Sequence, residues 1–411
     1  MKKSRLKTVD APEPNLGWTY LSREHLARAK AQMDKEAEGV RDEVGFLTIH
    51  QGYADLFFPG TSVLHTRARY LLFVPWLIED LSPLTGPSAK RALQEKERVL
   101  AGRLRNASNE NKPDRIGTIG GGIFPNPSAQ PPSTAYWNAL ATWGILRPRV
   151  DGRAISRAQA HKLVSVTRST IDDDGQLLAE FEPPFVNMPP RPENWTEGSI
   201  SLRLEHVEAT FIRKHLVSLR PRGRAELSLL ARLAKLEVTP PNEMFDDAVL
   251  ETAGGDRAAL IRAQQAAYLS GIGRAVYDAL LEIIVEQTDK RSKSTRHRDH
   301  LAKMVDDFGE LASKLDISGL ENDIGALPKY LHAVIKATKT WLISGGGEPN
   351  VLFDVYNAAE ARKGTRARLA PTLDGRLRRA EWSIDEHGLA GVLHYRWSQV
   401  RTLLTDIAEA S

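Results

Sequence analysis

Apolar residues recur at helical spacing through the second half of the chain. Two such faces are formed by Leu204, Val207, Phe211, Leu216 and Leu219, and by Leu227, Leu230, Leu233 and Leu236. Start and stop signals predict further helices over 299–315, 321–343, 350–361 and 394–410, a helix start at Thr239 before two prolines, and a helix cap at Asp256. The short connections favour antiparallel neighbours, as in a helical bundle.

The first half has a less regular pattern. Ser22 and Gly39 are the expected cap and stop of a helix over 22–38. A buried helix is predicted over 66–81, because Tyr70, Phe73 and Trp76 fall on one face of an apolar run. Another helix is predicted from Ser133 to Gly144, with Tyr136, Trp137, Leu140 and Trp143 at helical spacing.

The segments between these helices define the expected domains. Residues 103–133 lack an apolar period and predict a long loop, whereas 147–168 predict a basic loop and helix. Asp172, Asp173, Asp174 and Gly175 are typical of a hairpin turn between two short strands. Because 411 residues exceed the usual size of one core, we expect a mixed α/β domain over 1–190 and a helical domain over 191–411, with a linker at 182–194. The fold class is therefore mainly α with a minor β component.

Composition narrows the class of protein. The chain is 41% hydrophobic and 26% charged, as in globular proteins, and has no cysteine, which excludes disulfides and thiolate metal sites. The basic start MKKSRLK is followed by TVDAPEPNLG where a signal peptide needs an apolar region. The longest apolar run, 71–78, contains Pro75 and is too short to span a bilayer. We expect a cytoplasmic protein with no membrane segment.

Common catalytic and cofactor motifs are absent. No Gly-Lys pair exists for a P-loop, no Gly-x-Ser-x-Gly elbow occurs, and the triplets at 120–122 and 345–347 lack the third glycine of a dinucleotide fingerprint. The Glu110-Asn111-Lys112 triplet lies in a polar loop rather than on a nuclease strand. His297 and His300 stand three apart in a Lys/Arg-rich stretch, which favours solvated side chains over metal ligands. We expect no cofactor and no metal.

One acid–arginine constellation remains in the first half. Asp42, Glu43, Arg67 and Arg69 lie near aromatic runs and are the candidates for a partly buried catalytic site. A structural ion-pair network that holds a loop against the helix is the favoured interpretation of the same residues. Similarly, the aromatic stripe Tyr136, Trp137 and Trp143 could stack on bases, but at helical spacing it is more typical of core.

Three arginine-rich segments carry the strongest functional signal. Residues 213–224 hold five basic residues and no acid, 289–303 hold six against Asp289 and Asp299, and 362–379 hold seven against Asp374. Concentrated arginine favours bidentate phosphate contacts, so these segments predict a nucleic-acid surface, with docking of an acidic protein as the alternative. The predicted binding residues are Arg220, Arg222, Arg224, Arg291, Lys293, Arg296, Arg298, Arg366, Arg368, Arg378 and Arg379.

Several motifs resemble an uncharacterised bacterial family that carries a domain-of-unknown-function label. They are Gly17-Trp18, Arg41-Asp42-Glu43-Val44-Gly45, FPGTSVLHTRARYLLFVPW at 58–76, YWNALATWGI at 136–145 and HYRW at 394–397. The resemblance implies a subunit of an anti-phage defence system that acts with a helicase, a methyltransferase or a phospholipase-D-like nuclease. It supplies no catalytic residues.

The sequence thus favours a non-catalytic, nucleic-acid-binding accessory subunit of such a system. DNA is expected ahead of RNA, with a helicase or nuclease as protein partner. Two alternatives stay open: an enzyme of unfamiliar type with a site around 41–69, and a pure protein scaffold. A pocket that holds Asp42, Glu43 and Arg67 with shifted protonation would favour the enzyme, whereas burial of these groups in mutual ion pairs would oppose it. A large exposed apolar patch on the helical domain, rather than a basic groove, would favour the scaffold.

Overall fold

The computed structural model describes residues 44–106, 116–149, 151–169, 182–291 and 293–410. Within these ranges the chain is mainly helical and forms no sheet, which confirms the predicted main class. One isolated antiparallel β-bridge joins Leu146 and Phe185. The predicted helix over 22–38 and the hairpin around Asp172 lie outside the described residues, as does the Glu110-Asn111-Lys112 triplet.

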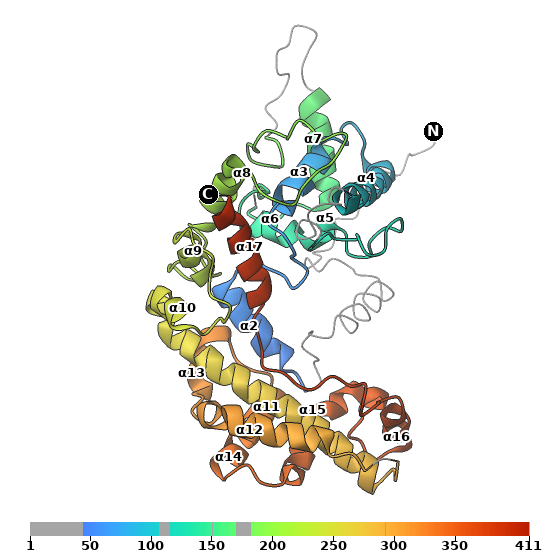
Figure 1. Cartoon of the computed structure of the whole chain (residues 1–411), viewed down its shortest axis with the longest axis vertical. Helices are drawn as coiled ribbons and strands as arrows, with labels where there is room; N and C mark the ends of the chain where they lie inside the picture. The colour runs from blue at the N-terminus through green and yellow to red at the C-terminus, as the bar shows by residue number, and fades with distance from the viewer. Residues whose placement is uncertain (1–43, 107–115, 150, 170–181, 292, 411) are drawn as a thin grey trace, which may run out of the picture. The chain divides into compact units, whose positions relative to one another are not determined.

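In the first half, a buried helix is surrounded by amphipathic ones. The helices are α2 (Leu47–Phe57), α3 (Tyr70–Glu79), α4 (Gly86–Asn106), α5 (Pro132–Ala135), α6 (Trp137–Thr142) and α7 (Arg157–Ser169). Every residue of α3 from Tyr70 to Ile78 is buried, because α4, α5 and α7 all pack against it (Figure 1). The predicted buried helix is confirmed, with shorter bounds.

The aromatic stripe is core, as predicted. Tyr136 and Trp143 are buried, and Trp137 packs against the core from its edge. The Tyr136 hydroxyl also accepts the backbone N–H groups of Thr66 and Arg67 at 2.8 and 3.0 Å. These rings therefore hold the turn that precedes α3.

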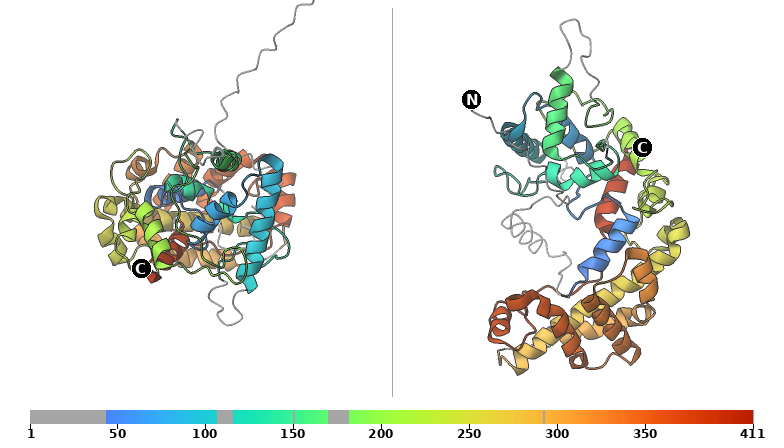
Figure 2. Two further views of the ribbon diagram at one scale, coloured as in Figure 1. Left: turned by 90° about the horizontal axis from the view of Figure 1, so that it is seen from above. Right: turned by 180° about the vertical axis from the view of Figure 1, so that it is seen from behind.

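The second half is built around one long helix. Its elements are α8 (His206–Leu216), α9 (Leu229–Ala234), α10 (Asp247–Thr252), η2 (Gly254–Asp256), α11 (Arg257–Gln287), α12 (Arg296–Ser313), α13 (Ile317–Ile324), α14 (Lys329–Ile343), η3 (Pro349–Leu352), α15 (Phe353–Glu360), η4 (Ala361–Arg366), α16 (Leu373–Ala380) and α17 (Trp397–Glu409). α12 runs alongside α11, as both views show (Figures 1 and 2). Within α11, Gly273 lets Phe46 approach the helix, since a Cβ there would lie 2.4 Å from the ring.

The end of the chain packs against the earlier helices of the second half. α17 packs against α8 and α9, and the Tyr395 hydroxyl donates to the carbonyl of Ala263 in α11 at 2.8 Å. By their contacts, the described residues between 44 and 410 form one compact unit. The expected boundary near residue 190 stays a prediction.

Some predicted details differ from the structure. The helix start at Thr239 is wrong: the next helix begins after Asp246, whose side chain accepts the N–H of Ala248 at 3.0 Å. A capping oxygen needs free N–H groups in the first turn, and the two prolines that follow Thr239 have none. The expected loop over 103–133 begins only after α4 ends at Asn106, and the predicted 321–343 helix is divided between α13 and α14.

Candidate functional site

Arg67 forms a buried ion pair with the last helix. Its Nε lies 2.9 and 3.0 Å from the two carboxylate oxygens of Asp406, and the N–H of Ala68 donates to the same group at 2.8 Å. Burial raises the pKa of Asp406, although the Arg67 guanidinium opposes this effect. All the donors aimed at Asp406 thus come from the turn before α3, so this pair fixes α17 against that turn.

Arg69 pairs with a different carboxylate. Its guanidinium donates to Glu208 at 2.8 and 3.3 Å and to the carbonyl of Ser201 at 2.9 Å. Glu208 also accepts the N–H of Glu205 at 2.9 Å in the capping box that begins α8. Asp42 and Glu43, the other members of the predicted constellation, lie outside the described residues.

The structure reveals a buried carboxyl group that sequence reasoning missed. Glu97 in α4 accepts the N–H of Ser133 at 2.7 Å, and burial raises its pKa to about 7. The signal for it was available, because Leu93, Glu97, Leu100 and Leu104 share one helical face. The adjacent cleft measures about 10 Å³, which leaves room for at most one water molecule and not for a substrate.

The two histidines of the RHRDH stretch are structural contacts. The Nε2 atoms of His297 and His300 lie 3.1 and 2.7 Å from the carbonyls of Ile384 and Ala390. Across the described ranges, no group of three or more histidine or acidic side chains could hold a metal ion.

Neighbouring arginines also serve the fold. Arg296 donates to the carbonyls of Ile384, Asp385 and His387 at 2.6–3.0 Å, which holds the segment that follows α16. Arg298 contacts two carboxylates of α11, Glu282 at 3.1 Å and Glu286 at 2.6 Å. Both guanidiniums, predicted to bind nucleic acid, are thus engaged within the protein.

The 220–224 segment lies near the start of α11. Arg220 donates to the carbonyl of Ala225, and Arg224 contacts the carbonyl of Asp323 and the carboxylate of Asp256, while Arg222 is exposed. The 290–293 segment follows the end of the same helix, which has 31 residues. At 1.5 Å per residue the two segments are roughly 45 Å apart along the helix axis, so they form two surfaces and not one groove.

At the end of α11, three arginines share one carboxylate. Arg379, itself buried, places Nε and Nη2 2.8 and 3.0 Å from the oxygens of Asp289. Arg291 and Arg376 approach the same carboxylate at 3.7 and 3.9 Å. We call these four residues the Asp289 arginine cluster. The hydrogen bonds from Arg379 are the main reason that the pKa of Asp289 is lowered.

Other cations lie in the same two segments of the chain as this cluster. η4 is connected to α11 through Glu360, whose carboxylate accepts the Tyr277 hydroxyl at 2.6 Å and the N–H groups of Arg368 and Leu369. The segments 289–293 and 360–381 together carry ten basic and four acidic residues, a net charge of +6, against +4 for the entire chain. We call the nine of these residues other than the buried Arg379 the basic surface: Lys290, Arg291, Lys293, Arg362, Lys363, Arg366, Arg368, Arg376 and Arg378.

The members of the basic surface differ in their exposure. Arg366 and Lys293 are exposed, and Arg376 is 64% exposed. Arg378 is partly engaged by Glu381 on the same helix at 3.0 Å. Exposed guanidiniums next to a saturated carboxylate can bind an additional anion.

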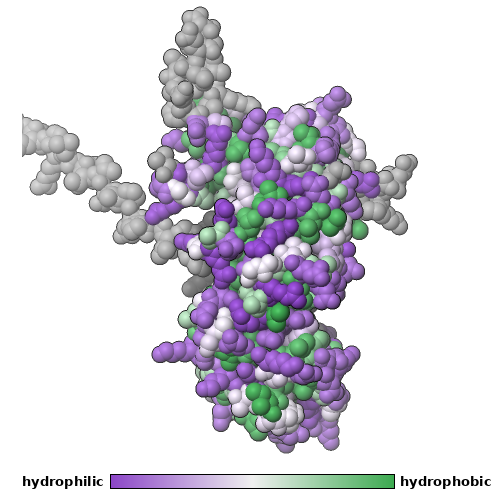
Figure 3. Space-filling model, turned by 90° about the vertical axis from the view of Figure 1, so that its left-hand side faces the viewer, coloured by the Kyte–Doolittle hydropathy of each residue, from purple (hydrophilic) through white to green (hydrophobic). Residues whose placement is uncertain are grey.

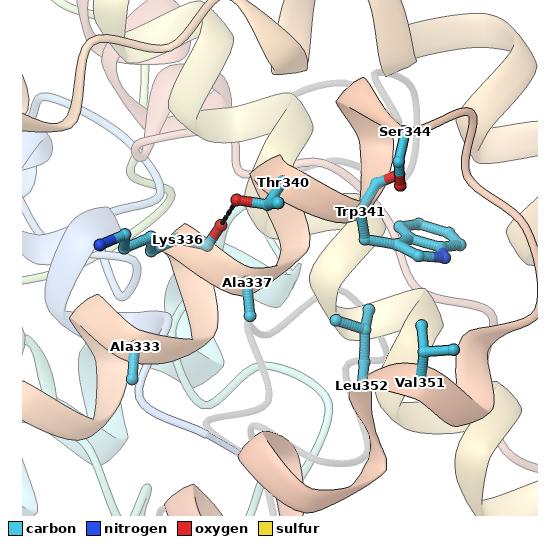
Figure 4. Close-up of a pocket in the computed structure, with 8 residues that line it drawn as sticks. All are labelled: Ala333, Lys336, Ala337, Thr340, Trp341, Ser344, Val351 and Leu352. Carbon is cyan, nitrogen blue, oxygen red and sulfur yellow. Dashed lines mark hydrogen bonds between the residues drawn. The ribbon is translucent and has the colours of Figure 1, made fainter.

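An apolar groove lies elsewhere, between α14 and η3 (Figure 4). It has a volume of about 540 Å³ and is lined by Ala333, Lys336, Ala337, Thr340, Trp341, Ser344, Val351 and Leu352. Val351 is 74% exposed beside it, and Ile343 at the end of α14 is 66% exposed. On the face in Figure 3, by contrast, hydrophobic side chains are scattered among hydrophilic ones. None of the described helices combines the length and apolar content that crossing a membrane requires.

Comparison with known proteins places the chain in a family without a known activity. No curated protein and no solved structure matches it. The model of a family of unknown function, DUF6361, matches residues 14–320, which include Arg67, Arg69 and α11. Residues beyond 320, with α16 and the groove, lie outside the match. The match covers well over half of the sequence, and the chain therefore belongs to the DUF6361 family of unknown function.

Proposed function

We propose that this protein is a non-catalytic nucleic-acid-binding protein, with DNA ahead of RNA as its ligand, and that the basic surface is its binding site. The observation that carries this proposal is the concentration of charge: +6 in two short segments, against +4 for the whole chain. Such a positive field attracts the phosphate backbone regardless of base sequence.

The arrangement of cations supports the nucleic-acid proposal over its alternatives. For an enzyme around 41–69, Arg67 and Arg69 would have to leave the carboxylates that now hold them at 2.9 and 2.8 Å. For a scaffold, the apolar groove beside α14 is the nearest match to an exposed apolar patch, but Lys336 and Thr340 line it too. Neither alternative accounts for the surplus of arginine at the end of α11.

A salt titration tests the proposal. Duplex DNA binding, measured by fluorescence anisotropy, should weaken with salt, with a slope of log affinity against log salt of about −3 or steeper. The double variant R366A/R376A should make this slope less steep by about 2, because each lost cation removes one phosphate contact. Arg91→Ala, which removes an exposed arginine of α4, is the matched control and should leave the slope unchanged. Absence of binding at low salt would overturn the proposal.

The accessory role is the second half of the proposal. A protein without its own catalytic site acts through a partner, and the resemblance predicts a helicase or nuclease of an anti-phage defence system. Native expression followed by identification of the co-purified protein tests this. A chain that purifies alone under all conditions, yet binds DNA, would contradict the accessory role and leave DNA binding intact.

A further inference from the structure

The end of α11 positions Arg291 against the helix. Lys290 has a φ of +55°, a left-handed conformation that reverses the chain. As a result, the N–H of Arg291 donates to the carbonyl of Val285 at 3.2 Å, and its guanidinium donates to the carbonyl of Arg379 at 2.7 Å. Arg291 is thus fixed at both its backbone and its side chain, although its side chain is 37% exposed.

The charge of Asp289 is already neutralised. Arg379 makes two hydrogen bonds to its carboxylate, which is fully buried, and it donates to the carbonyl of Ala370 at 2.9 Å as well. With a further bond to the carbonyl of Arg368, Arg379 uses four of its five N–H donors within the protein, and because its side chain is buried it is not open to a ligand.

Arg291 and Arg376 carry the remaining charge. Each approaches a different oxygen of Asp289, at distances beyond a hydrogen bond. Among the described residues, neither has another carboxylate within 4 Å, and the cluster holds three positive charges against one negative charge. The cluster therefore has a net charge of +2. The guanidiniums of Arg291 and Arg376 are held near one buried carboxylate, but they are themselves partly exposed and have N–H donors to spare.

We propose that Arg291 and Arg376 bind a terminal phosphate of a nucleic-acid strand, an inference that rests on the proposed function. A terminal phosphate monoester carries about −1.5 to −2 charges at neutral pH, whereas each internal phosphodiester carries one. The net charge of the cluster matches the monoester. Planar guanidiniums also suit the three oxygens of a terminal phosphate, which accept paired hydrogen bonds.

Two oligonucleotides of one sequence, with a 5′-phosphate or a 5′-hydroxyl and a 3′ fluorophore, test the inference on the full chain. At near-physiological salt, the phosphorylated strand should bind about fivefold tighter or more, because charge-assisted hydrogen bonds resist screening better than the diffuse field. Arg376→Ala and Arg291→Ala should each abolish this preference. Arg376→Lys should restore part of it, since lysine keeps the charge and loses the fork geometry.

The controls separate this inference from the proposed function. Arg91→Ala should retain the preference, and millimolar adenosine 5′-monophosphate should compete poorly, because it lacks the adjoining backbone. Equal, salt-dependent binding of both strands would overturn the terminal-phosphate site and leave the proposed function standing. Binding of neither strand would overturn both. A preference that survives both alanine variants, or strong competition by the mononucleotide, would overturn the site as assigned.

Discussion

Two arginine-rich regions of this protein look alike in the sequence and differ in charge balance. Before α3, Arg67 and Arg69 each have a carboxylate of their own, Asp406 and Glu208. After α11, three arginines share Asp289. The first region has at least one carboxylate for each arginine, since Glu205 also lies 3.7 Å from Arg69, whereas the second keeps a surplus of positive charge at the surface.

The pKa shifts of the carboxyl groups follow the same difference. Burial raises the pKa of Asp406 despite its one arginine, whereas the arginines around Asp289 lower its pKa despite burial. The ratio of arginine to carboxylate in space, and not the density of arginine along the chain, therefore separates a balanced ion pair from a cluster with surplus positive charge.

Breaking an architectural pair should have the largest effect. Arg69→Met leaves the buried carboxylate of Glu208 without its main partner and should cost about 3–5 kcal/mol of unfolding free energy. Chemical denaturation measures this cost. The double variant R69M/E208Q should recover much of the loss, because no charge is left buried and unpaired. An unchanged stability in R69M would contradict the architectural role and return Arg69 to the candidates for a catalytic site.

Glu97 extends the comparison to a buried carboxyl with no arginine hydrogen bond. Its raised pKa of about 7 means that the folded protein holds a proton that the unfolded chain releases near pH 4.5. The stability it contributes is therefore present below pH 4.5 and is lost as the pH rises to about 7. Glu97→Gln keeps an acceptor for the Ser133 N–H and cannot ionise.

Glu97→Gln should consequently be more stable than the natural chain at pH 8, by up to ~3 kcal/mol, and equal to it at pH 4.5. Unfolding by urea at both values measures the difference. Glu95→Gln, on the exposed face of the same helix, is the control and should show no such gain. A constant difference between Glu97→Gln and the natural chain across this range would show that the pKa of Glu97 is not raised in the folded protein.

Loss of Arg379 should cost less than loss of Arg69. In Arg379→Met, Asp289 keeps Arg291 and Arg376 within 4 Å, and either can move to pair with it, so we expect a cost of about 1–3 kcal/mol. The terminal-phosphate preference should fall as well, because the replacement partner is taken from the binding pair. A cost equal to that of Arg69→Met would mean that the cluster does not rearrange.

Sequence patterns predicted the parts of the fold that depend on local spacing. The apolar run around Trp76 and the helices of the second half follow from periodicity, and α11 begins directly after Asp256 as predicted, although the Asp256 side chain makes no capping hydrogen bond. α11 was foreseen only at its cap, because a helix buried on most sides has no polar face to reveal its period. α16 was not predicted because it is short and strongly polar, and so has too few apolar residues to reveal a helical period.

The partners of the arginines could not be predicted in this way. Arg67 and Asp406 are 339 positions apart, and Asp289 and Arg379 are 90 apart, so no spacing rule connects them. The basic segments were visible, but their division into exposed members such as Arg366 and engaged members such as Arg296 depends on tertiary contacts.

Arg376→Ala should have the smallest effect on stability and a clear effect on binding. Its side chain is largely exposed and makes only a long contact with Asp289, so the unfolding free energy should change by less than ~0.5 kcal/mol. Arg91→Ala should also change the unfolding free energy by less than ~0.5 kcal/mol. DNA affinity, in contrast, should fall only for Arg376→Ala. Thermal unfolding and anisotropy on the same samples measure both quantities. A large loss of stability would mean that Arg376 belongs to the architecture, and the contrast between the two regions would then reduce to Arg291 alone.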